Sequence, residues 1–423
     1  MINLIYTQSF NIVKQILSNG IVLIHNYNKQ PVISTFIFLK TGTIYEPYNL
    51  SGISELLHAT ITKGTKTRTS YRIAEEIESL GGSISAESGD DFSTLSLTIL
   101  NQNFEKGVEI LSDIFFNPLF PEEEIEKEKI NIIAEIMSRK DSIFNVAIDE
   151  LLISMYGKKH PYGRDPYKEI KYIKKLKRKD ILEWWKKFYG IDLNKKNIVI
   201  VVSGDIKFEK VKEVIEKNFL NIKKITLPPL QHTGLKPSYR HIKKKTHFKQ
   251  AYLMYGYYAP SLRKDDIKKY ISLKLINFYL GGGMSGKLFE VLREKNSLCY
   301  ETNSFYPGKF LESHFVIYLG LDKTKMDVAK KELNNIIQHL KNHGINEEEL
   351  KECKNKLKGR ILLDHQTNSK QAWYLGFWEI MDLGYEFDRE YIEEIEKITL
   401  DEINTFLKDI LNNKNTIVEL IPK

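Results

Sequence analysis

The stretch 52–65, which reads GISELLHATITKGT, places two metal-binding residue types in an apolar helical pattern. Glu55 and His58 stand three residues apart, so a helix carries both side chains on one face. A zinc peptidase helix of the inverted type needs a His, then a Glu three residues later and a second His directly after that Glu. The two imidazoles bind the metal, and the carboxylate serves as general base. Here Ala59 follows His58, so the stretch has related residues without the ligand pattern.

The residues around these positions resemble one family of zinc peptidases. A Gly-Ile pair opens the stretch and a Lys-Gly-Thr closes it at 63–65. This is similar to the pitrilysin, insulinase and mitochondrial processing peptidase family, whose helix reads Gly-x-Ala-His-Phe-Leu-Glu-His and is followed by Lys-Gly-Thr. In that alignment the first His falls on Glu55, the Glu on His58 and the second His on Ala59. The resemblance therefore implies a zinc motif in which all three chemical positions are replaced.

The third zinc ligand of the resembled family is missing as well. In that family a Glu lies seven residues before the proline of a His-Pro-Leu-Gly-Arg stretch. The matching stretch here is HPYGR at 160–164, and counting back from Pro161 leads to Ser154. Zinc takes Cys, His and carboxylate ligands, so Ser154 is a poor replacement. The two losses lie far apart in the sequence, and together they remove every ligand of one site.

A residual metal site is an alternative to complete loss. It would use Glu55, His58 and Glu150, which lies one helical turn before Ser154. This set lacks the spacing of the motif and has no spare general base. The simpler interpretation is that Glu55 and His58 form a helix pair worth about 0.2–0.5 kcal/mol. We therefore expect no metal and no other cofactor in this chain, and we expect zinc in a partner.

A second motif of the family, in the other half of the chain, is kept. The chain reads GGGMSGKLF at 281–289 and REKNSLCY at 293–300. The family has Gly-Gly-Gly-Met-Ser-Ser-Arg-Leu-Phe and then Arg-Glu-Lys-Arg-Gly-Leu-Ala-Tyr, whose Arg and Tyr reach the active site and hydrogen-bond the substrate. Arg293 and Tyr300 match that pair in type and spacing. The departures lie between them, at Asn296, Ser297 and Cys299.

Arg293 and Tyr300 have the chemistry of an electrophilic clamp. A guanidinium presents several fixed donors and a phenol adds one more, which suits a substrate carbonyl or the oxyanion that forms when water attacks it. The structural alternative is an Arg paired with a nearby carboxylate and a Tyr that caps the core. Three glycines at 281–283 also suggest phosphate binding, but neither a Walker Lys-Ser/Thr nor a nucleotide-fold strand accompanies them.

Composition disfavours several other classes of protein. The chain has 423 residues, 42% of them hydrophobic, which is enough for two or more domains with their own cores. Its 63 basic and 55 acidic residues are interspersed, so the basic runs at 171–179 and 241–249 are interpreted as solvated surface or linker rather than a nucleic-acid site. Two cysteines make neither a disulfide framework nor a metal motif. Without a visible signal sequence or membrane span, we expect a cytoplasmic protein.

The chain repeats itself, which sets its domain organisation. The segments 173–204 and 395–422 share an Asp ahead of a helix, an Asn-rich connection and an apolar strand. A repeat of this length indicates two copies of one domain. Between the copies, 222–249 contains several prolines, Pro237 among them, and many basic residues, so it is predicted to be a linker. We expect an α+β fold with two homologous domains, 1–221 and 250–423, as in the resembled family.

The order of elements in the first half favours a sheet with an exposed edge. We predict strands at 20–25, 32–41, 83–86 and 92–100, and helices at 71–80 and 103–115. In the resembled family, unfolded substrate pairs with an exposed sheet edge, so main-chain hydrogen bonds supply affinity. The matching strand lies around 83–88. Its implied substrate-binding residues are Ser83, Ile84, Ser85, Ala86 and Glu87.

The resemblance implies a subunit of a two-subunit peptidase. In some members of the family only one of the two subunits holds zinc, and its partner supplies groups from its own second domain. A chain without the zinc residues that keeps Arg293 and Tyr300 is similar to that partner. We expect half of a clam-shell heterodimer with a homologous zinc-bearing subunit, acting on unfolded peptides and inactive alone. The alternatives are an inert scaffold subunit of a larger complex and a stand-alone peptide-binding module.

Overall fold

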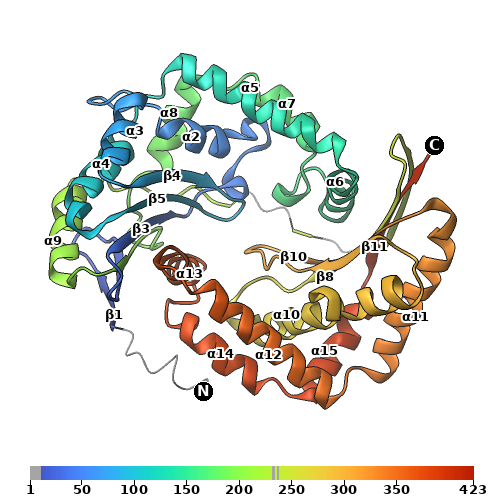
Figure 1. Cartoon of the computed structure of the whole chain (residues 1–423). Coiled ribbons are helices and arrows are strands. Elements are labelled where there is room, and N and C mark those ends of the chain that lie inside the picture. The colour runs from blue at the N-terminus through green and yellow to red at the C-terminus, as the bar shows by residue number, and fades with distance from the viewer. Residues whose placement is uncertain (1–10, 231–233, 236–237) are drawn as a thin grey trace. The chain divides into compact units, whose positions relative to one another are not determined.

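A computed structural model describes residues 11–230, 234–235 and 238–423 of the chain. The described residues form two compact units, each with one sheet and helices packed on it (Figure 1). This confirms the expected α+β fold with two domains. The first ten residues and part of the expected linker, Pro237 included, lie outside the described residues. No described helix is both long and apolar enough to cross a membrane.

The first unit is built on a six-stranded sheet of order β1-β2-β6-β3-β5-β4. Its strands are β1 (Asn11–Ile16), β2 (Val22–Tyr27), β3 (Val32–Leu39), β4 (Ser83–Ser88), β5 (Ser93–Leu100) and β6 (Ile198–Gly204). Central β6, IVIVVSG, is apolar almost throughout and buried at every residue, as expected for a strand covered on both faces. Strand β4 pairs only with β5 and forms one edge of the sheet.

The helices of the first unit follow the apolar periodicity of the sequence. They are α2 (Ile53–Ile61), α3 (Ser70–Ser79), α4 (Phe104–Phe116), α8 (Arg178–Phe188), α9 (Phe208–Phe219), α13 (Asn368–Ile380) and, for most of their lengths, α5 (Glu122–Ser138) and α7 (Pro166–Ile173). Helix α3 ends just before Gly81, whose φ of +69° lets the chain turn into β4. The strands and helices predicted for this half are present, although strand β1 is an element that the sequence pattern did not predict.

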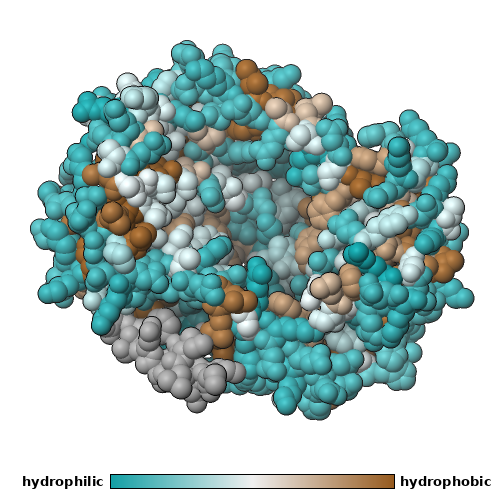
Figure 2. Space-filling view, in the orientation of Figure 1, coloured by the Kyte–Doolittle hydropathy of each residue, from teal (hydrophilic) through white to brown (hydrophobic). Residues whose placement is uncertain are grey.

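The second unit repeats the plan with a five-stranded sheet of order β7-β11-β8-β10-β9. Its strands are β7 (Arg240–Thr246), β8 (Ala251–Ala259), β9 (Glu301–Phe305), β10 (Ser313–Leu321) and β11 (Asn415–Pro422). Its helices are α6 (Ile143–Tyr156), α10 (Ile267–Gly281), α11 (Met326–His343), α12 (Glu347–Asp364), α14 (Phe387–Lys397) and α15 (Leu400–Asn412). Charged residues line the outer faces of these helices, and the surface visible in Figure 2 is largely hydrophilic.

The two units are not continuous stretches of chain. Among the described residues, the first takes 11–134, 169–230 and Asp364–Asp388, and the second takes the rest. Helix α13, from the C-terminal half of the sequence, therefore packs on β3 and β6 of the first sheet. Its Gly376 lies so close to Phe38 that an added Cβ would stand 2.0 Å from the ring.

Helix α6, from the N-terminal half, packs in the same way on β8 and β11 of the second sheet. The hydroxyl of Tyr258 donates to the carbonyl oxygen of Met155 over 2.8 Å. A Cβ added to Gly256 would stand only 2.6 Å from the Met155 sulfur, so the helix lies too close to the strand for a larger residue there. Each sheet thus buries one face under a helix encoded far from it in the sequence.

The segment 222–249 is not wholly a linker, because it contains strand β7. Residues Arg240–Thr246, RHIKKKT, pair in parallel with β11 at the edge of the second sheet. Most of the strand is exposed, so it needs no apolar periodicity, and the basic run concealed it. One member of that run, Lys244, is not simply solvated, because it forms an ion pair with Glu150 of α6.

Candidate functional site

Helix α2 carries the three replaced positions of the zinc motif and is held firmly at its start. Gly52 precedes the helix with φ +84°, a conformation that favours glycine. The buried Glu46 carboxylate accepts hydrogen bonds from the backbone nitrogens of Gly52 at 3.0 Å and Ser54 at 2.8 Å. A carboxylate at this end satisfies free N–H groups and complements the helix dipole. The orientation of the helix is therefore well defined.

His58 points into the core of the first unit and is only 3% exposed. Its Nδ1 lies 2.8 Å from the carbonyl oxygen of Ser54, and its Nε2 lies 3.0 Å from the hydroxyl of Tyr189. Because a carbonyl can only accept, Nδ1 carries the proton and Nε2 accepts from Tyr189. Burial lowers the pKa of His58 to about 4, against a weaker opposing effect of the bond to Ser54. Both ring nitrogens are committed, so His58 is a structural residue of the core.

The two flanking positions of the motif differ from His58 in their surroundings. Glu55 is exposed on the outer side of α2, and Ala59 is half-buried. An aspartate or glutamate binds zinc, but one carboxylate beside a methyl group does not make a zinc site. The helix thus presents one oxygen ligand where the family motif presents two imidazoles.

The position of the third ligand is found on α6 in the second unit. Ser154 is half-buried there, and Glu150, one turn earlier, forms an ion pair with Lys244 of β7. An ammonium in contact with the carboxylate competes with a cation for the same oxygens. Glu150 therefore has a structural partner within its own unit.

The described residues do not fit a zinc ion. They contain no group of three or more His, Cys, Asp or Glu side chains placed to hold a metal. The residual site considered from the sequence needs the imidazole of His58, which is bonded at both nitrogens, and the carboxylate of Glu150, which is paired with Lys244.

Arg293 lies at the end of a short wide helix, Phe289–Lys295, in the second unit. Its side chain is exposed, and its guanidinium carbon stands 4.9 Å from the centre of the Phe289 ring. Within the described part of the chain, no ion pair or side-chain hydrogen bond engages the guanidinium. A cation over an aromatic ring keeps its outward N–H donors available. The interpretation of Arg293 as half of a structural ion pair is thus not supported.

Tyr300 follows on the far side of a turn that is fixed by its backbone. The nitrogen of Leu298 bonds to the carbonyl of Leu292 at 2.7 Å, and the nitrogen of Tyr300 bonds to Gly320 of β10 at 2.9 Å. Tyr300 is 56% exposed, and its hydroxyl has no partner among the residues that the structure describes. A phenol buried to cap a core would be covered and bonded. The fold therefore brings Arg293 and Tyr300 to the two ends of one rigid turn with their donors exposed.

Strand β4 provides the exposed edge predicted at 83–88. It pairs with β5 in the register Ser83↔Thr98 to Ser88↔Ser93, and α2 lies against it within the first unit. Alternate residues are exposed, namely Ser83, Ser85 and Glu87, with Ile84 and Ala86 half-covered between them. Because β4 is the last strand of the sheet, its outer backbone groups are open to another strand.

Sequence patterns gave no signal for the residues that engage His58 and Glu150, the two candidate ligands of the residual site. Tyr189 lies 131 residues from His58, and Lys244 lies 94 residues from Glu150. Neither separation has a periodicity, so only the folded chain pairs them. A buried position for His58 was foreseeable from its apolar neighbours Leu57 and Ile61, since a helix in a large domain buries such a face.

Comparison with known proteins agrees with the fold. Residues 21–165 match the family described as insulinase, peptidase family M16, and residues 175–357 match the domain described as the peptidase M16 inactive domain. The chain is 29% identical over 421 residues to an uncharacterized zinc protease of Rickettsia felis, covering 98% of this chain and 96% of that protein.

Two further relatives come from Helicobacter pylori. One is a "non-peptidase homolog" called YmxG, 25% identical over 366 residues and covering 85% of this chain and 82% of that protein. The other is the crystal structure of a protease, which superposes with a TM-score of 0.88 at 21% identity over 98% of this chain and 100% of that one. The chain belongs to the M16 peptidase family, and it is a member whose zinc-binding positions are replaced.

Proposed function

We propose that this chain is the zinc-free subunit of a two-subunit M16 peptidase and lends substrate-binding groups to a zinc-bearing partner. The observation that carries the proposal is the contrast between its two motifs. In the zinc motif, His58 is buried and bonded at both nitrogens, so the position is closed to a metal. In the second motif, Arg293 and Tyr300 remain exposed, and their donors are uncommitted among the described residues.

The role of the pair is stabilisation of the substrate carbonyl. Negative charge builds on that oxygen as water attacks, and fixed donors aimed at it lower the barrier. The substrate is an unfolded peptide that also pairs with β4, because an open strand edge recognises main chain rather than sequence.

The proposal places the complex in the cytoplasm. Cys299 and Cys353 are both buried free thiols, which a reducing compartment maintains. This assignment is independent of the peptidase role.

A scaffold without a catalytic part is the second candidate. The name of the Helicobacter pylori relative, "non-peptidase homolog", favours it. A scaffold subunit makes no use of Arg293 and Tyr300, so the two candidates differ in whether these residues affect peptide cleavage. A stand-alone peptide-binding module is the third, and it requires only β4.

Co-expression with an M16 homologue that carries His-x-x-Glu-His tests the main proposal. The two chains should elute together in size-exclusion chromatography, because a stable heterodimer is expected to bury about 1,200 Å² or more. The mixture should cleave an unfolded peptide faster than the partner alone. Separate elution at micromolar concentration, with unchanged partner activity on mixing, would overturn the heterodimer. Co-elution without added activity would support the scaffold instead.

A further inference from the structure

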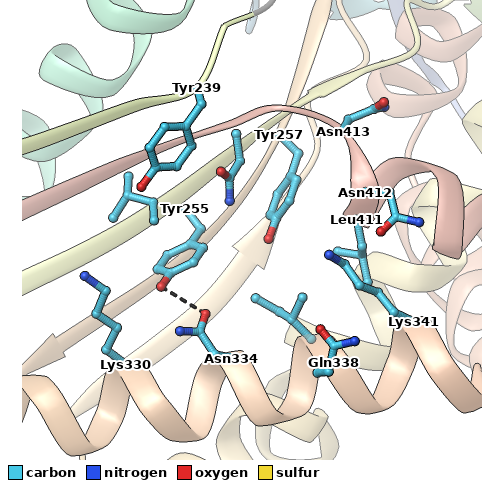
Figure 3. Close-up of a pocket in the computed structure, with 13 residues that line it drawn as sticks. Tyr239, Tyr255, Tyr257, Lys330, Asn334, Gln338, Lys341, Leu411, Asn412 and Asn413 are labelled. Carbon is cyan, nitrogen blue, oxygen red and sulfur yellow. Dashed lines mark hydrogen bonds between the residues drawn. The ribbon is translucent and has the colours of Figure 1, made fainter.

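The second unit contains a polar pocket whose described lining residues belong to neither motif. It has a volume of about 400 Å³ and opens between the start of β11, the neighbouring strand β8 and helix α11. Figure 3 shows Tyr239, Tyr255 and Tyr257 facing Asn334, Gln338 and Lys341 of the helix across this space. The volume falls within the range of small-molecule sites, but hydroxyls, amides and ammonium groups dominate the lining.

In the first sheet, the positions that correspond to Tyr255 and Tyr257 carry aliphatic side chains. Leu39 pairs with Ile198, the first residue of β6, just as Tyr257 pairs with Asn415, the first residue of β11. Phe38 faces helix α13, and Gly256 faces helix α6. Because side chains alternate along a strand, the residues on either side of Phe38 and of Gly256 point to the opposite face of their sheet. Ile37 and Leu39 are fully buried there, whereas the second sheet has Tyr255 and Tyr257.

The two phenols are buried but oriented towards the amides of the pocket. The hydroxyl of Tyr255 donates to the side-chain oxygen of Asn334 over 3.1 Å, and Tyr257 lines the same pocket beside Asn415, its partner in the strand register. A buried hydroxyl costs free energy unless it is bonded, and an aliphatic residue fills the same place without that cost. The amide of Asn334, which holds the phenol of Tyr255, also lines the pocket. The arrangement positions donors and acceptors in fixed directions.

The loop before β11 also differs from its counterpart. Before β6, the amide of Asn197 is fully buried, donates to the carbonyl of Gly190 over 2.8 Å and accepts from Asp192 at 2.7 Å. Before β11, the side chains of Asn412 and Asn413 are exposed at the mouth of the pocket and have no hydrogen-bond partner among the described residues. The Asn-rich connection thus uses its amide for internal hydrogen bonds in the first unit, whereas in the second unit its amides are available to a ligand.

The charge of the pocket is positive. Lys330 is paired with Glu419, whereas Lys341 has no ion pair in the part of the chain that the structure describes. No Asp or Glu is among the described lining residues. An ammonium without a counterion in a site rich in neutral donors and acceptors suits a ligand with one negative group and several hydroxyls.

We propose that this pocket binds a hydroxyl-rich small molecule carrying one anionic group, such as a sugar phosphate or a sugar acid. Lys341 neutralises the anion, the amides of Asn334 and Gln338 exchange hydrogen bonds with hydroxyls, and the exposed ring of Tyr239 covers an apolar face of the ligand. The site is separate from the proposed peptidase role.

Isothermal titration of the purified full chain with glucose 6-phosphate tests the proposal. We expect saturable binding with a Kd of about 1 mM or lower, and about tenfold weaker binding of glucose and of inorganic phosphate, since each lacks half of the recognised groups. Lys341→Ala and Tyr255→Phe should each weaken glucose 6-phosphate by about tenfold. Lys331→Ala, on the same helix but outside the pocket, is the matched control and should bind like the wild type.

Several results would overturn the site. The first is an absence of saturable heat with glucose 6-phosphate in a chain that is folded by circular dichroism. The second is equal binding by Lys341→Ala and Lys331→Ala. Binding of inorganic phosphate as tight as that of glucose 6-phosphate would also overturn it, because the hydroxyl contacts would then contribute nothing. Since Lys341 is only partly covered, loss of folding is not expected to obscure these comparisons.

Discussion

The hydroxyl of Tyr189 lies 3.0 Å from Nε2 of His58, and this contact occupies the nitrogen that a metal would need. The other nitrogen, Nδ1, donates to the carbonyl of Ser54. In a chain whose sequence retains a His and a Glu at the former zinc helix, the decisive fact is therefore the direction of the imidazole. It has become part of the core, and burial also raises the pKa of Tyr189 well above its usual range.

A pH-dependent loss of stability should follow from His58. Burial lowers its folded pKa to about 4 from 6.5, so in this interval the unfolded chain binds a proton that the folded chain does not. The stability is fully present above pH 6.5 and decreases as the pH falls towards 4. His58→Gln should remove about 2 kcal/mol of the decrease in unfolding free energy between about pH 7 and 4.5, as measured by urea denaturation.

The exposed His339, replaced by Gln, is the control and should leave the pH dependence of the wild type unchanged. His58→Gln should also be less stable than the wild type at neutral pH, by about 1–3 kcal/mol, since two buried hydrogen bonds are altered. Parallel stability curves for His58→Gln and the wild type would contradict the buried neutral imidazole.

The isolated chain should not bind zinc stoichiometrically or cleave peptides. Ala59 and Ser154 offer no ligand, and the imidazole of His58 is committed. Elemental analysis after dialysis against zinc should find far less than one ion per chain. One tightly held zinc that disappears in His58→Ala would show that the ring turns outward and would refute this prediction.

Tyr300→Phe should lower kcat of the reconstituted heterodimer without affecting assembly. The substitution deletes only the hydroxyl, and loss of one donor to a developing oxyanion costs about 10²- to 10³-fold. Arg293→Lys keeps the charge but loses the planar fork, so a decrease of the same kind is expected. Steady-state kinetics on an unfolded peptide measure both.

Glu294→Gln is the matched control, because it is an exposed neighbour of Arg293 and lies outside the matched pair. Its kcat should equal that of the wild type. Thermal unfolding of all three variants should match the wild type, since neither Arg293 nor Tyr300 has a hydrogen-bond or ion-pair partner among the described side chains. Wild-type kcat in both Tyr300→Phe and Arg293→Lys would favour the scaffold, and a raised KM with kcat intact would indicate binding alone.

A bound peptide should protect the backbone of β4. Only one side of this strand is paired, so its outward N–H groups exchange with solvent until another strand covers them. Hydrogen exchange of the heterodimer with an unfolded peptide should slow within Ser83–Ser88. Strand β6, paired on both sides, is the internal reference and should not change. Unaltered exchange in β4 at saturating peptide would exclude it as the substrate edge.

The sequence by itself determined the local elements and the chemical inventory. Apolar alternation in β5, helical periodicity in α4 and the glycine turn at Gly81 specify structure through interactions between near neighbours. The replacement of the zinc-motif residues can be seen in the sequence itself, and folding does not change which residues are present. The repeat between 173–204 and 395–422 likewise predicted two similar sheets, because equal patterns bury equal faces.

Only the tertiary structure decided which distant segments cover those sheets and what the ionisable side chains contact. Helix α13 packs on β3 and β6 although more than 160 residues separate it from β6, and α6 packs on β8 and β11. Helical periodicity predicts which face of a helix is buried, but it does not predict which other element covers that face. In the same way, the sequence allows His58 and Glu150 as metal ligands, and only the folded structure shows that they contact Tyr189 and Lys244 instead. Such pairings depend on long-range packing, for which a single sequence carries no periodic signal.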